Sequence, residues 1–562
     1  MKKVALIIAG AVSLGSYEAG ALTELLYALD KLNKKSNEEG NGNAYELDVI
    51  TGASAGSLTA AMVARIMMYD YPNLKKNLHD AWVDKIDIVH LLEDPPENAL
   101  LSKNIIRQIA REYLALPTKS NGPASFAPSG DKPLRTSFAM SNMNGIDYEI
   151  PYQVPKKGSM FPTTFFSDFA RNKFFANKFK NTEEWNQMVS EAIASGSFPI
   201  AFQSEPVKRK PEDYPGSTQA IKNPDFFKDP LAFIDGGMFN NEPLKEAIKL
   251  AKEADEEEEN PDRIFILVDP NVNKSRSHPD PISANQPFKE YLVNWVKMAL
   301  GEIDAKDWMR ADHTNNKIDW AKNYYGILAS LINSSSQTEQ HAISQTLKDQ
   351  ANAIIDKKRE YNPTKYADDN QTILKRDLGN IIRRNQRFHN TLAIPALKEI
   401  LSYSIFILDN AAGINNKLNI QFALIGSKKE QTAGDELFAF LGFFKKDWRE
   451  YDYRKGRIKA HELLKEFLAP YEMEMKPGTS DSVEDYKIPT EWGNFSEARL
   501  KEADTKPRVL LRDRVMHLLK AELATTFGMK IVWFFFSSKI RSMIGKQLEL
   551  VEEPPNPESW ME

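Results

Sequence analysis

One stretch of the chain, residues 46–57 with the sequence ELDVITGASAGS, constrains the fold more than any other. A short apolar run, Leu47 to Ile50, leads into Gly52-Ala-Ser-Ala-Gly56, and an apolar segment without proline follows from Leu58 to Met68. This order predicts a strand, a sharp turn and a helix. The glycines beside Ser54 lack the Cβ atoms that would clash in so tight a turn. The turn lifts the Ser54 hydroxyl above the sheet, at the positive end of the new helix, which is the geometry of an activated nucleophile.

The pentapeptide G-x-S-x-G is weak support when taken alone. At ordinary glycine and serine usage, a chain of 562 residues contains about 0.1 to 0.2 such matches by chance. A serine and two glycines in an ordinary turn before a helix remain the alternative. The strand before and the helix after favour the nucleophile, and the rest of the chain must supply its partners.

Composition narrows the classes of protein to consider. A chain of 562 residues with 42% hydrophobic and 27% charged residues predicts a globular protein of two or three domains. The formal net charge of −5 is small, so we expect no nucleic-acid partner. The chain has no cysteine, which excludes disulfides, thiolate metal sites and a cysteine nucleophile, and fits either redox compartment.

The N-terminus allows two interpretations. Two lysines followed by the apolar run Val4 to Val12 resemble a signal peptide, or they form a buried first strand that ends in a glycine turn at Gly10. We favour the strand, because the residues that follow belong to the site argued below. No uninterrupted run of 18 apolar residues occurs, so we predict no transmembrane helix and expect a cytoplasmic protein.

The first half of the chain alternates between strand and helix patterns. A strand over residues 4–9, a helix over 17–34 and the strand before Ser54 form a βαβ unit, which predicts an α/β fold with a parallel, helix-covered sheet. Residues 84–132 read as a helical, lid-like insertion. Further expected elements are a strand pair, 134–140 and 148–154, around a turn at 142–145, a helix over 185–194, a strand over 231–234, a helix over 243–254 and a strand over 264–268.

The second half of the chain is dominated by long helical patterns. Its charged runs are typical of solvated helix faces. The expected elements are helices over 287–302, 316–333, 338–358 and 372–412, a strand over 420–425, helices over 435–443 and 446–468, and a helical region over 506–550.

A second group of candidate residues is Asp235-Gly236-Gly237, at the end of the apolar run Leu231 to Ile234. Two glycines let this turn approach a neighbouring backbone closely. An ordinary strand-to-helix turn with a capping aspartate is the alternative. In a parallel sheet, Ser54 and Asp235 would both lie at the carboxyl ends of strands, where such sheets place ligands.

A nucleophilic serine needs a base. None of the eight histidines has a sequence context that makes it the partner of Ser54: they are residues 79, 90, 278, 313, 341, 389, 461 and 517. A carboxylate is therefore the expected base. An aspartate with its ordinary pKa of about 4 is a weak base near neutral pH, so burial must raise that pKa.

A third element is the glycine turn from Gly10 to Gly15 after the first strand. Its backbone N–H groups, together with that of Ala55, are candidates to stabilise an oxyanion. A phosphate-binding loop is the alternative, which we disfavour because the chain has neither G-x-G-x-x-G nor a Walker lysine here.

These motifs, in this order, resemble those of the patatin-like phospholipase family. The resemblance rests on Gly10 to Leu22, Gly52 to Gly56, Ala194-Ser-Gly-Ser-Phe-Pro-Ile-Ala-Phe202 and Asp235 to Gly237, and it extends over about residues 4–270. The segment Asp447-Trp-Arg-Glu-Tyr-Asp-Tyr-Arg-Lys-Gly-Arg457 is similar to the C-terminal region of longer bacterial members.

The resemblance implies a three-layer α/β/α core with a mainly parallel sheet in residues 1–280, followed by a mostly helical region over 281–562. It also implies a lipid acyl hydrolase that uses a Ser–Asp dyad and forms an acyl-enzyme intermediate. No metal or cofactor is implied. The implied site comprises Ser54 and Asp235 as dyad, Gly52 and Gly56 in the elbow, Gly236 and Gly237 in support, and Gly10, Ala11, Val12 and Ala55 at the oxyanion.

The oxyanion loop departs from the family pattern. The family usually has three consecutive glycines and a basic residue before the last glycine, whereas this chain has Gly10-Ala11-Val12 with Leu14 at the basic position. Alanine and valine tolerate positive φ badly, so we expect a reshaped loop with altered activity or substrate choice.

Residues 523–548 are the candidate for membrane contact. Aromatic bulk around Trp533-Phe-Phe-Phe536 lies beside four basic residues and no acidic ones, which fits an interfacial segment on anionic lipid. A core helix packed on the catalytic domain is the alternative, because the aromatic run has no clean polar face.

Three functions follow from this sequence. The first is a lipid acyl hydrolase that acts on phospholipid or lysophospholipid. The second is an esterase or thioesterase on other acyl substrates, and the third a weakly active patatin-like scaffold that binds membrane or a partner. The distance between Ser54 and Asp235 discriminates the enzymes from the scaffold.

Overall fold

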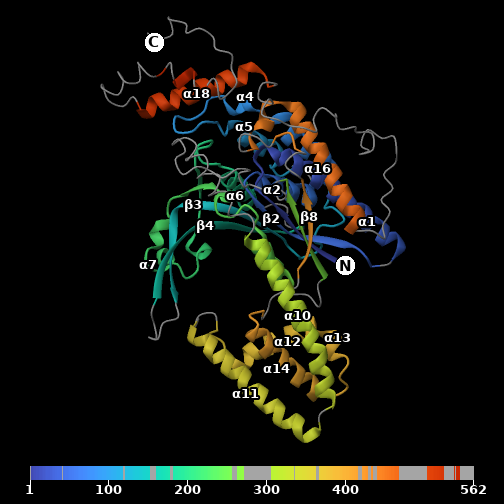
Figure 1. The fold of residues 1–562 in the computed structure, drawn as a ribbon. Helices are drawn as coiled ribbons and strands as arrows, with labels where there is room; N and C mark the ends of the chain where they lie inside the picture. Colours follow the sequence, from blue (N-terminus) through green and yellow to red (C-terminus); the bar gives the residue numbers. More distant parts are fainter. Residues whose placement is uncertain are drawn as a thin grey trace, which may run out of the picture.

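The fold was analysed in a computed structural model (Figure 1). The structure describes residues 2–40, 42–117, 120–151, 160–176, 182–255, 262–270, 306–334, 336–361, 366–414, 420–427, 432–434, 439–467, 503–523, 537, 540–542 and 544.

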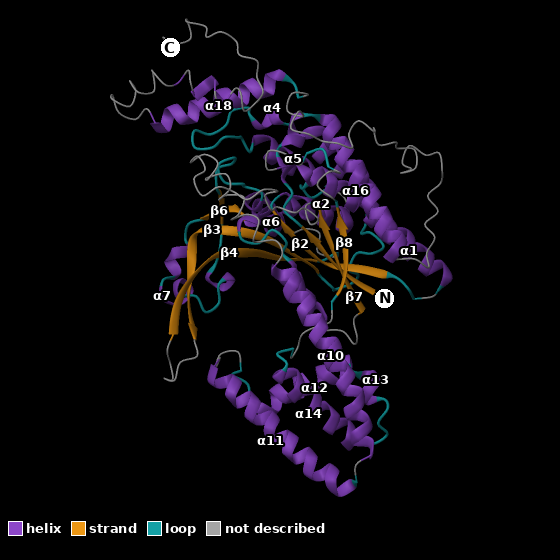
Figure 2. Ribbon diagram, in the orientation of Figure 1, coloured by secondary structure: helices purple, strands orange, loops and turns teal. Residues whose placement is uncertain are grey.

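A curled sheet of eight strands lies at the centre of the molecule (Figure 2). Its order is β5-β6-β3-β2-β1-β7-β8, with β4 paired to β3. Strands β3, β2, β1, β7 and β8 run parallel, whereas β4, β5 and β6 join by antiparallel pairing, so the sheet is mainly parallel as expected. The strands are β1 (Lys2–Ile8), β2 (Tyr45–Ala53), β3 (Leu134–Pro151), β4 (Met160–Phe174), β5 (Glu205–Val207), β6 (Leu231–Asp235), β7 (Asp262–Asp269) and β8 (Gln421–Gly426).

Helices cover both faces of this sheet. In β1, Val4, Leu6 and Ile8 point into one core, and the alternate residues Ala5 and Ile7 into another. The first core is covered by α1 (Gly15–Glu39), α2 (Ala55–Tyr69) and α16 (Lys446–Phe467), the second by α8 (Leu244–Asp255). The three-layer α/β/α architecture is therefore confirmed.

The strand pair predicted around residues 142–145 is wrong. Residues 134–151 form one continuous strand, β3, whose partner is β4, a strand that the sequence analysis did not predict. The register shifts between Ser141 and Ile146, and Gly145 has a φ of 69°. The Asn-Gly pair thus marks a bulge within a long strand rather than the end of one.

Short helices fill the span between α2 and β3. The expected insertion over 84–132 packs against the main core, because its longest helix buries Ile105, Ile106 and Ile109. Its role as a lid stays a prediction. The helices of this span are α3 (Leu74–His79), the π-helix η3 (Asp80–Lys85), α4 (Ile88–Leu91) and α5 (Asn104–Tyr113); further on, α6 (Thr182–Ser195) packs on α2, and α7 (Thr218–Lys222) contacts β3.

A separate helical lobe follows β7 in the sequence and has its own core. The single helix predicted over 372–412 is wrong: the chain breaks at Asn385 and again before Pro395, which takes the first helical turn as proline does readily. The helices of the lobe are α10 (Lys306–Ser334), α11 (Gln337–Tyr361), α12 (Asn370–Arg384), α13 (Gln386–His389) and α14 (Pro395–Ala411).

After this lobe the chain returns to the first core. Strand β8 pairs with β7, and α16 packs along α1, so parts of the region predicted as the helical half complete the central sheet and its cover. Gly20 and Gly456 allow the close approach, because a Cβ at Gly456 would lie 2.0 Å from the Tyr17 carbonyl oxygen. The described C-terminal helix, α18 (Thr505–Leu523), lies near α4 (Figure 1).

Two expectations fall largely or wholly outside the described residues: the helix over 287–302, and most of the proposed membrane segment 523–548. Within the described ranges, no helix combines the length and the apolar character needed to span a bilayer.

Candidate active site

Two strand ends bring Ser54 and Asp235 together. β2 and β6 lie along the same edge of β3, because the opposite edge is taken by β4. β2 runs parallel to β3 and ends with Ala53 opposite Ala139, whereas β6 runs antiparallel and ends with Asp235 opposite Met140. The two carboxyl ends thus meet head to head at neighbouring residues of β3. The sequence analysis placed both residues at strand ends, but took the sheet around Asp235 to be parallel.

The turn after β2 holds Ser54 in a strained backbone conformation. Its φ is 51° and its ψ −129°, a backbone conformation that residues other than glycine rarely adopt. The predicted elbow glycines permit this turn: a Cβ at Gly52 would lie 2.6 Å from the Gly56 carbonyl oxygen, and one at Gly56 would lie 2.3 Å from the Ala9 carbonyl oxygen. The serine therefore stands at the tip of a tight strand-to-helix turn, as predicted.

The two side chains form a direct hydrogen bond. Ser54 Oγ donates to Asp235 Oδ2 at 2.5 Å, and Asp235 Oδ1 accepts the Gly237 N–H at 2.7 Å. Asp235 is 1% exposed, and this burial raises its pKa to about 7 against the lowering effect of both hydrogen bonds. A carboxylate with a pKa near neutrality is matched to the work of a general base.

The glycines after Asp235 allow its strand to approach β3. A Cβ at Gly236 would lie 2.0 Å from the Ala139 carbonyl oxygen, so no other residue fits without a shift. No hydrogen bond among the described residues joins Ser54 to a histidine.

Ser195 and Ser197 are supporting residues whose roles the sequence analysis missed, although it quoted the motif that contains them. Ser195 Oγ accepts the Ser54 N–H at 2.9 Å and donates to the Ala139 carbonyl at 2.6 Å. The Ser197 carbonyl accepts the Asp235 N–H at 3.0 Å. One short segment at the C-terminal end of α6 therefore holds the backbone of both Ser54 and Asp235. The only sequence signal for this role is that the segment consists of small residues, two of them serines.

The glycine turn after β1 lies beside the nucleophile, since a Cβ at Gly10 would be 3.0 Å from the Ser54 Cβ. The Gly10 N–H is engaged, because it donates to the Asn241 carbonyl at 3.0 Å. Val12 begins the 3-10 helix η1 (Val12–Leu14), and Ala55 begins α2, so neither N–H has an intrahelical acceptor. Val12 has a φ of 50°, while Ala11 stays at −136°. Of the two residues that replace the glycines usual in this loop, only Val12 has a strained backbone.

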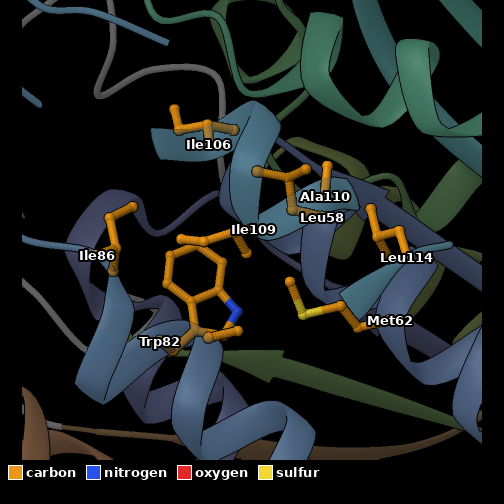
Figure 3. A pocket seen from close by; sticks show the side chains of 9 residues that line it. Leu58, Met62, Trp82, Ile86, Ile106, Ile109, Ala110 and Leu114 are labelled. Atoms are coloured by element: carbon orange, nitrogen blue, oxygen red, sulfur yellow. The ribbon is translucent and has the colours of Figure 1, made fainter. Parts of the chain in front are cut away.

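An apolar pocket lies along α2, beginning one helical turn beyond Ser54 (Figure 3). Its side chains come from α2, η3 and α5 and from the residues beside these helices, and they face one another across the pocket in Figure 3. The lining residues are Leu58, Met62, Ala81, Trp82, Ile86, Ile106, Ile109, Ala110 and Leu114.

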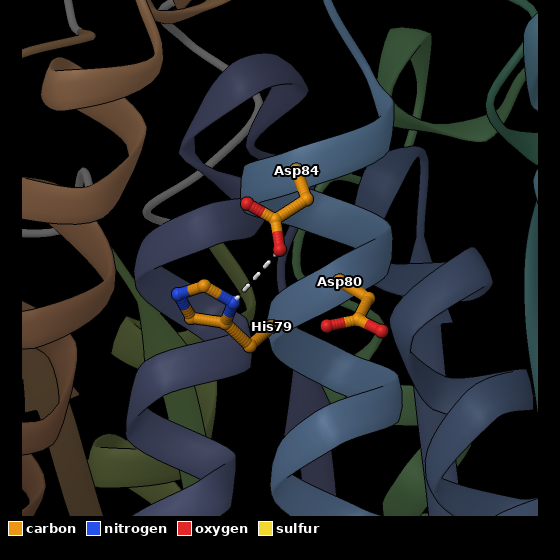
Figure 4. Close-up of side chains that lie close together, drawn as sticks. All are labelled: His79, Asp80 and Asp84. Atoms are coloured by element: carbon orange, nitrogen blue, oxygen red, sulfur yellow. Dashed lines mark ion pairs between the residues drawn. The ribbon is translucent and has the colours of Figure 1, made fainter.

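His79, Asp80 and Asp84 form the group with metal-ligand spacing found among the described residues (Figure 4). Other side chains already pair with each of them. Lys76 Nζ lies 2.5 Å from Asp80, Lys446 Nζ lies 2.5 Å from Asp84, and the Glu450 carboxylate accepts a hydrogen bond from His79 Nε2 at 2.6 Å. Because Lys446 and Glu450 belong to α16, the group forms a polar contact between α16 and the end of α3 with η3.

Comparison with known proteins identifies the domain that carries this site. Residues 6–248 match the sequence model of the patatin-like phospholipase family. This part of the chain is a patatin-like domain. The match includes Gly10, Ser54, Ser195 and Asp235, and it places the domain in a family of lipid acyl hydrolases.

A relative of the chain extends the comparison without naming an activity. The uncharacterized protein y4iI of Sinorhizobium fredii is 24% identical, over 43% of this chain and 44% of its own length. The chain thus spans less than half of that protein. The patatin-like domain match ends at residue 248, before β7, β8 and α16, which complete the sheet and its cover.

Proposed function

We propose that this protein is a serine acyl hydrolase that cleaves carboxylic esters of lipids with Ser54 as nucleophile and Asp235 as general base. The observation that carries the proposal is the 2.5 Å hydrogen bond between Ser54 Oγ and an Asp235 carboxylate whose buried position raises its pKa to about 7. This geometry weakens the alternative of a scaffold without catalytic power.

The reaction begins when Ser54 Oγ attacks the ester carbonyl carbon and gives its proton to Asp235. The negative charge that develops on the carbonyl oxygen is stabilised by the N–H of Ala55 and those of the Ala11–Val12 loop. When the tetrahedral intermediate collapses, the leaving alcohol takes the proton from Asp235 and an acyl-Ser54 ester remains. Water, deprotonated by Asp235, then attacks this ester, and as the acid is released Ser54 Oγ leaves with the proton from Asp235.

The apolar pocket along α2 encloses only about 20 Å³, room for a water-sized group rather than an acyl chain, so the acyl substrate class rests on the patatin-like match and not on this pocket. Its lining offers contacts from Leu58, Met62 and Ile109 but no charged side chain to hold a head group. An esterase or thioesterase on other acyl substrates uses the same dyad, and the choice between these substrates depends on which leaving group is accepted.

Labelling with a fluorophosphonate probe tests the proposal, because this reagent traps an activated serine without requiring the true substrate. We expect strong labelling of the wild type, and its loss in Ser54→Ala and Asp235→Asn. Absence of labelling in folded wild-type protein would overturn the dyad. Phospholipid, lysophospholipid and thioester panels on the active protein then decide the substrate class.

A further inference from the structure

The side chain that follows the strained Val12 is held by the far end of the chain. Ser13 is fully buried, and its Oγ accepts the Gly442 N–H at 3.1 Å and faces the Gly434 carbonyl at 3.5 Å. Both partners lie more than 400 residues away in the sequence and outside the patatin-like domain match. The conformation of the oxyanion loop is therefore coupled to residues of the C-terminal region.

Close packing fixes this contact. A Cβ at Gly442 would lie 2.6 Å from Ser13 Oγ, and one at Gly434 would lie 2.9 Å from the same atom. The backbone of the two glycines thus encloses the hydroxyl, and no larger residue fits at either position without a shift. Ala11, Leu14 and Ala439 pack into a small apolar cluster next to it.

Two charged residues of α16 hold these glycines in place. Asp452, fully buried, accepts the N–H groups of Ala433 at 2.5 Å and Gly434 at 2.8 Å. Arg449 donates from Nη1 to the Gly442 carbonyl at 3.1 Å, and from Nε to the Val83 carbonyl at 3.0 Å. Charge-assisted hydrogen bonds of this kind, made between buried groups, are among the strongest in proteins.

The strained backbone at Val12 explains why these contacts are needed. A non-glycine residue at positive φ is strained and persists only where its surroundings enforce it. The contacts of Ser13, the next residue, supply such enforcement from outside the loop. Glycines in the loop would adopt the same conformation without strain.

We propose that Asp452 and Arg449 are positioning residues, which act through Gly434, Gly442 and Ser13 to hold the Ala11–Val12 backbone as oxyanion donor. The inference rests on the proposed function, since it gives the helical C-terminal region a part in the same reaction. It assigns a role to the Asp447–Arg457 segment, which forms most of the first half of α16.

The experiment compares Asp452→Asn and Ser13→Ala with Glu462→Gln, a carboxylate-to-amide control on an exposed residue of the same helix. We would measure kcat and KM for a p-nitrophenyl ester, the midpoint of the pH–rate profile and the melting temperature. We expect kcat to fall about 10- to 100-fold in both test variants, because small displacements of oxyanion donors carry such a cost. KM and the pH midpoint, which reports Asp235, should stay unchanged, and the control should match the wild type.

The outcomes separate the two proposals. A wild type that neither hydrolyses esters nor reacts with the fluorophosphonate overturns the proposed function, and this inference with it. An active wild type whose kcat is unaltered by Ser13→Ala and Asp452→Asn overturns the inference alone, as does a shifted pH midpoint. Should Asp452→Asn fail to fold, Ser13→Ala decides the question, because it removes one oxygen atom and leaves every charge in place.

Discussion

Ser54 and Val12 have almost the same unusual φ angle, 51° and 50°, yet different parts of the chain enforce it. The turn at Ser54 is supported within the patatin-like domain, by the flanking glycines and by Ser195. The turn at Val12 is supported through Ser13 by residues 434–452. The conformation of Ser54 thus depends on contacts within the domain, whereas that of Val12 depends on contacts with the C-terminal region.

The largest loss of activity is expected from substitution of the two proposed catalytic residues, Ser54 and Asp235. Ser54→Ala and Asp235→Asn should each lower kcat by about 10⁴-fold or more, and the double variant should be no worse than Ser54→Ala, because residues that act as one unit are not additive. Steady-state ester hydrolysis measures this. Additive losses would contradict a single Ser–Asp unit.

The second prediction concerns the pH dependence of kcat/KM, which depends on Asp235. The pKa of Asp235 is raised to about 7, so its base form is lost as the pH falls, and kcat/KM should drop about tenfold per pH unit below 7. The Asp452→Asn variant should lower the plateau without moving the midpoint.

The same raised pKa predicts a stability effect. Between about pH 4 and 7 the folded protein keeps a proton on Asp235 that the unfolded chain releases, so the free energy of unfolding should fall as the pH rises through this window. Melting temperatures of Asp235→Asn should lack this contribution. An identical pH dependence in both proteins would count against the raised pKa.

A fourth prediction sharpens the comparison from inside the domain. Ser195→Ala leaves the Ser54 N–H without its acceptor, which should cost about 1–3 kcal/mol of stability and lower kcat about tenfold through misplacement of the nucleophile. Ser190→Ala, on the exposed side of the same helix, is the control. Thermal unfolding and kcat measure the two effects. If Ser195→Ala and Ser190→Ala behave alike, the local support of Ser54 is weaker than the geometry indicates.

The smallest effect is expected at Val12. In Val12→Gly, relief of backbone strain offsets the lost side-chain contacts and the greater freedom of the unfolded chain, so the free energy of unfolding should change by no more than about 1 kcal/mol. Chemical denaturation measures the change. The loss of kcat on adding Asp452→Asn should be smaller in the Val12→Gly background, where glycine adopts the positive φ without strain, and an equal loss would break the proposed link.

The sequence predicted those parts of the fold that depend on local patterns. The strand, turn and helix around Ser54 and the strand that ends at Asp235 follow from apolar runs and glycines a few residues apart, and they appear at the expected positions. Long-range features were not accessible in this way. The antiparallel direction of β6, the pairing of β3 with β4 and the contact of Ser13 with Gly442 each depend on segments whose meeting no local pattern encodes.

The addition of β8 to the sheet has a consequence for synthesis of the chain. β7 is complete at residue 269, but its partner β8 starts at residue 421, and α16 follows from residue 446. At ordinary rates of about 5–20 residues per second, the ribosome needs roughly 10–30 s to make the intervening chain. During that time β7 is an open sheet edge and α1 an uncovered apolar face, which are sites of association with other chains. The nascent protein therefore carries both Ser54 and Asp235 for many seconds before it can close its sheet.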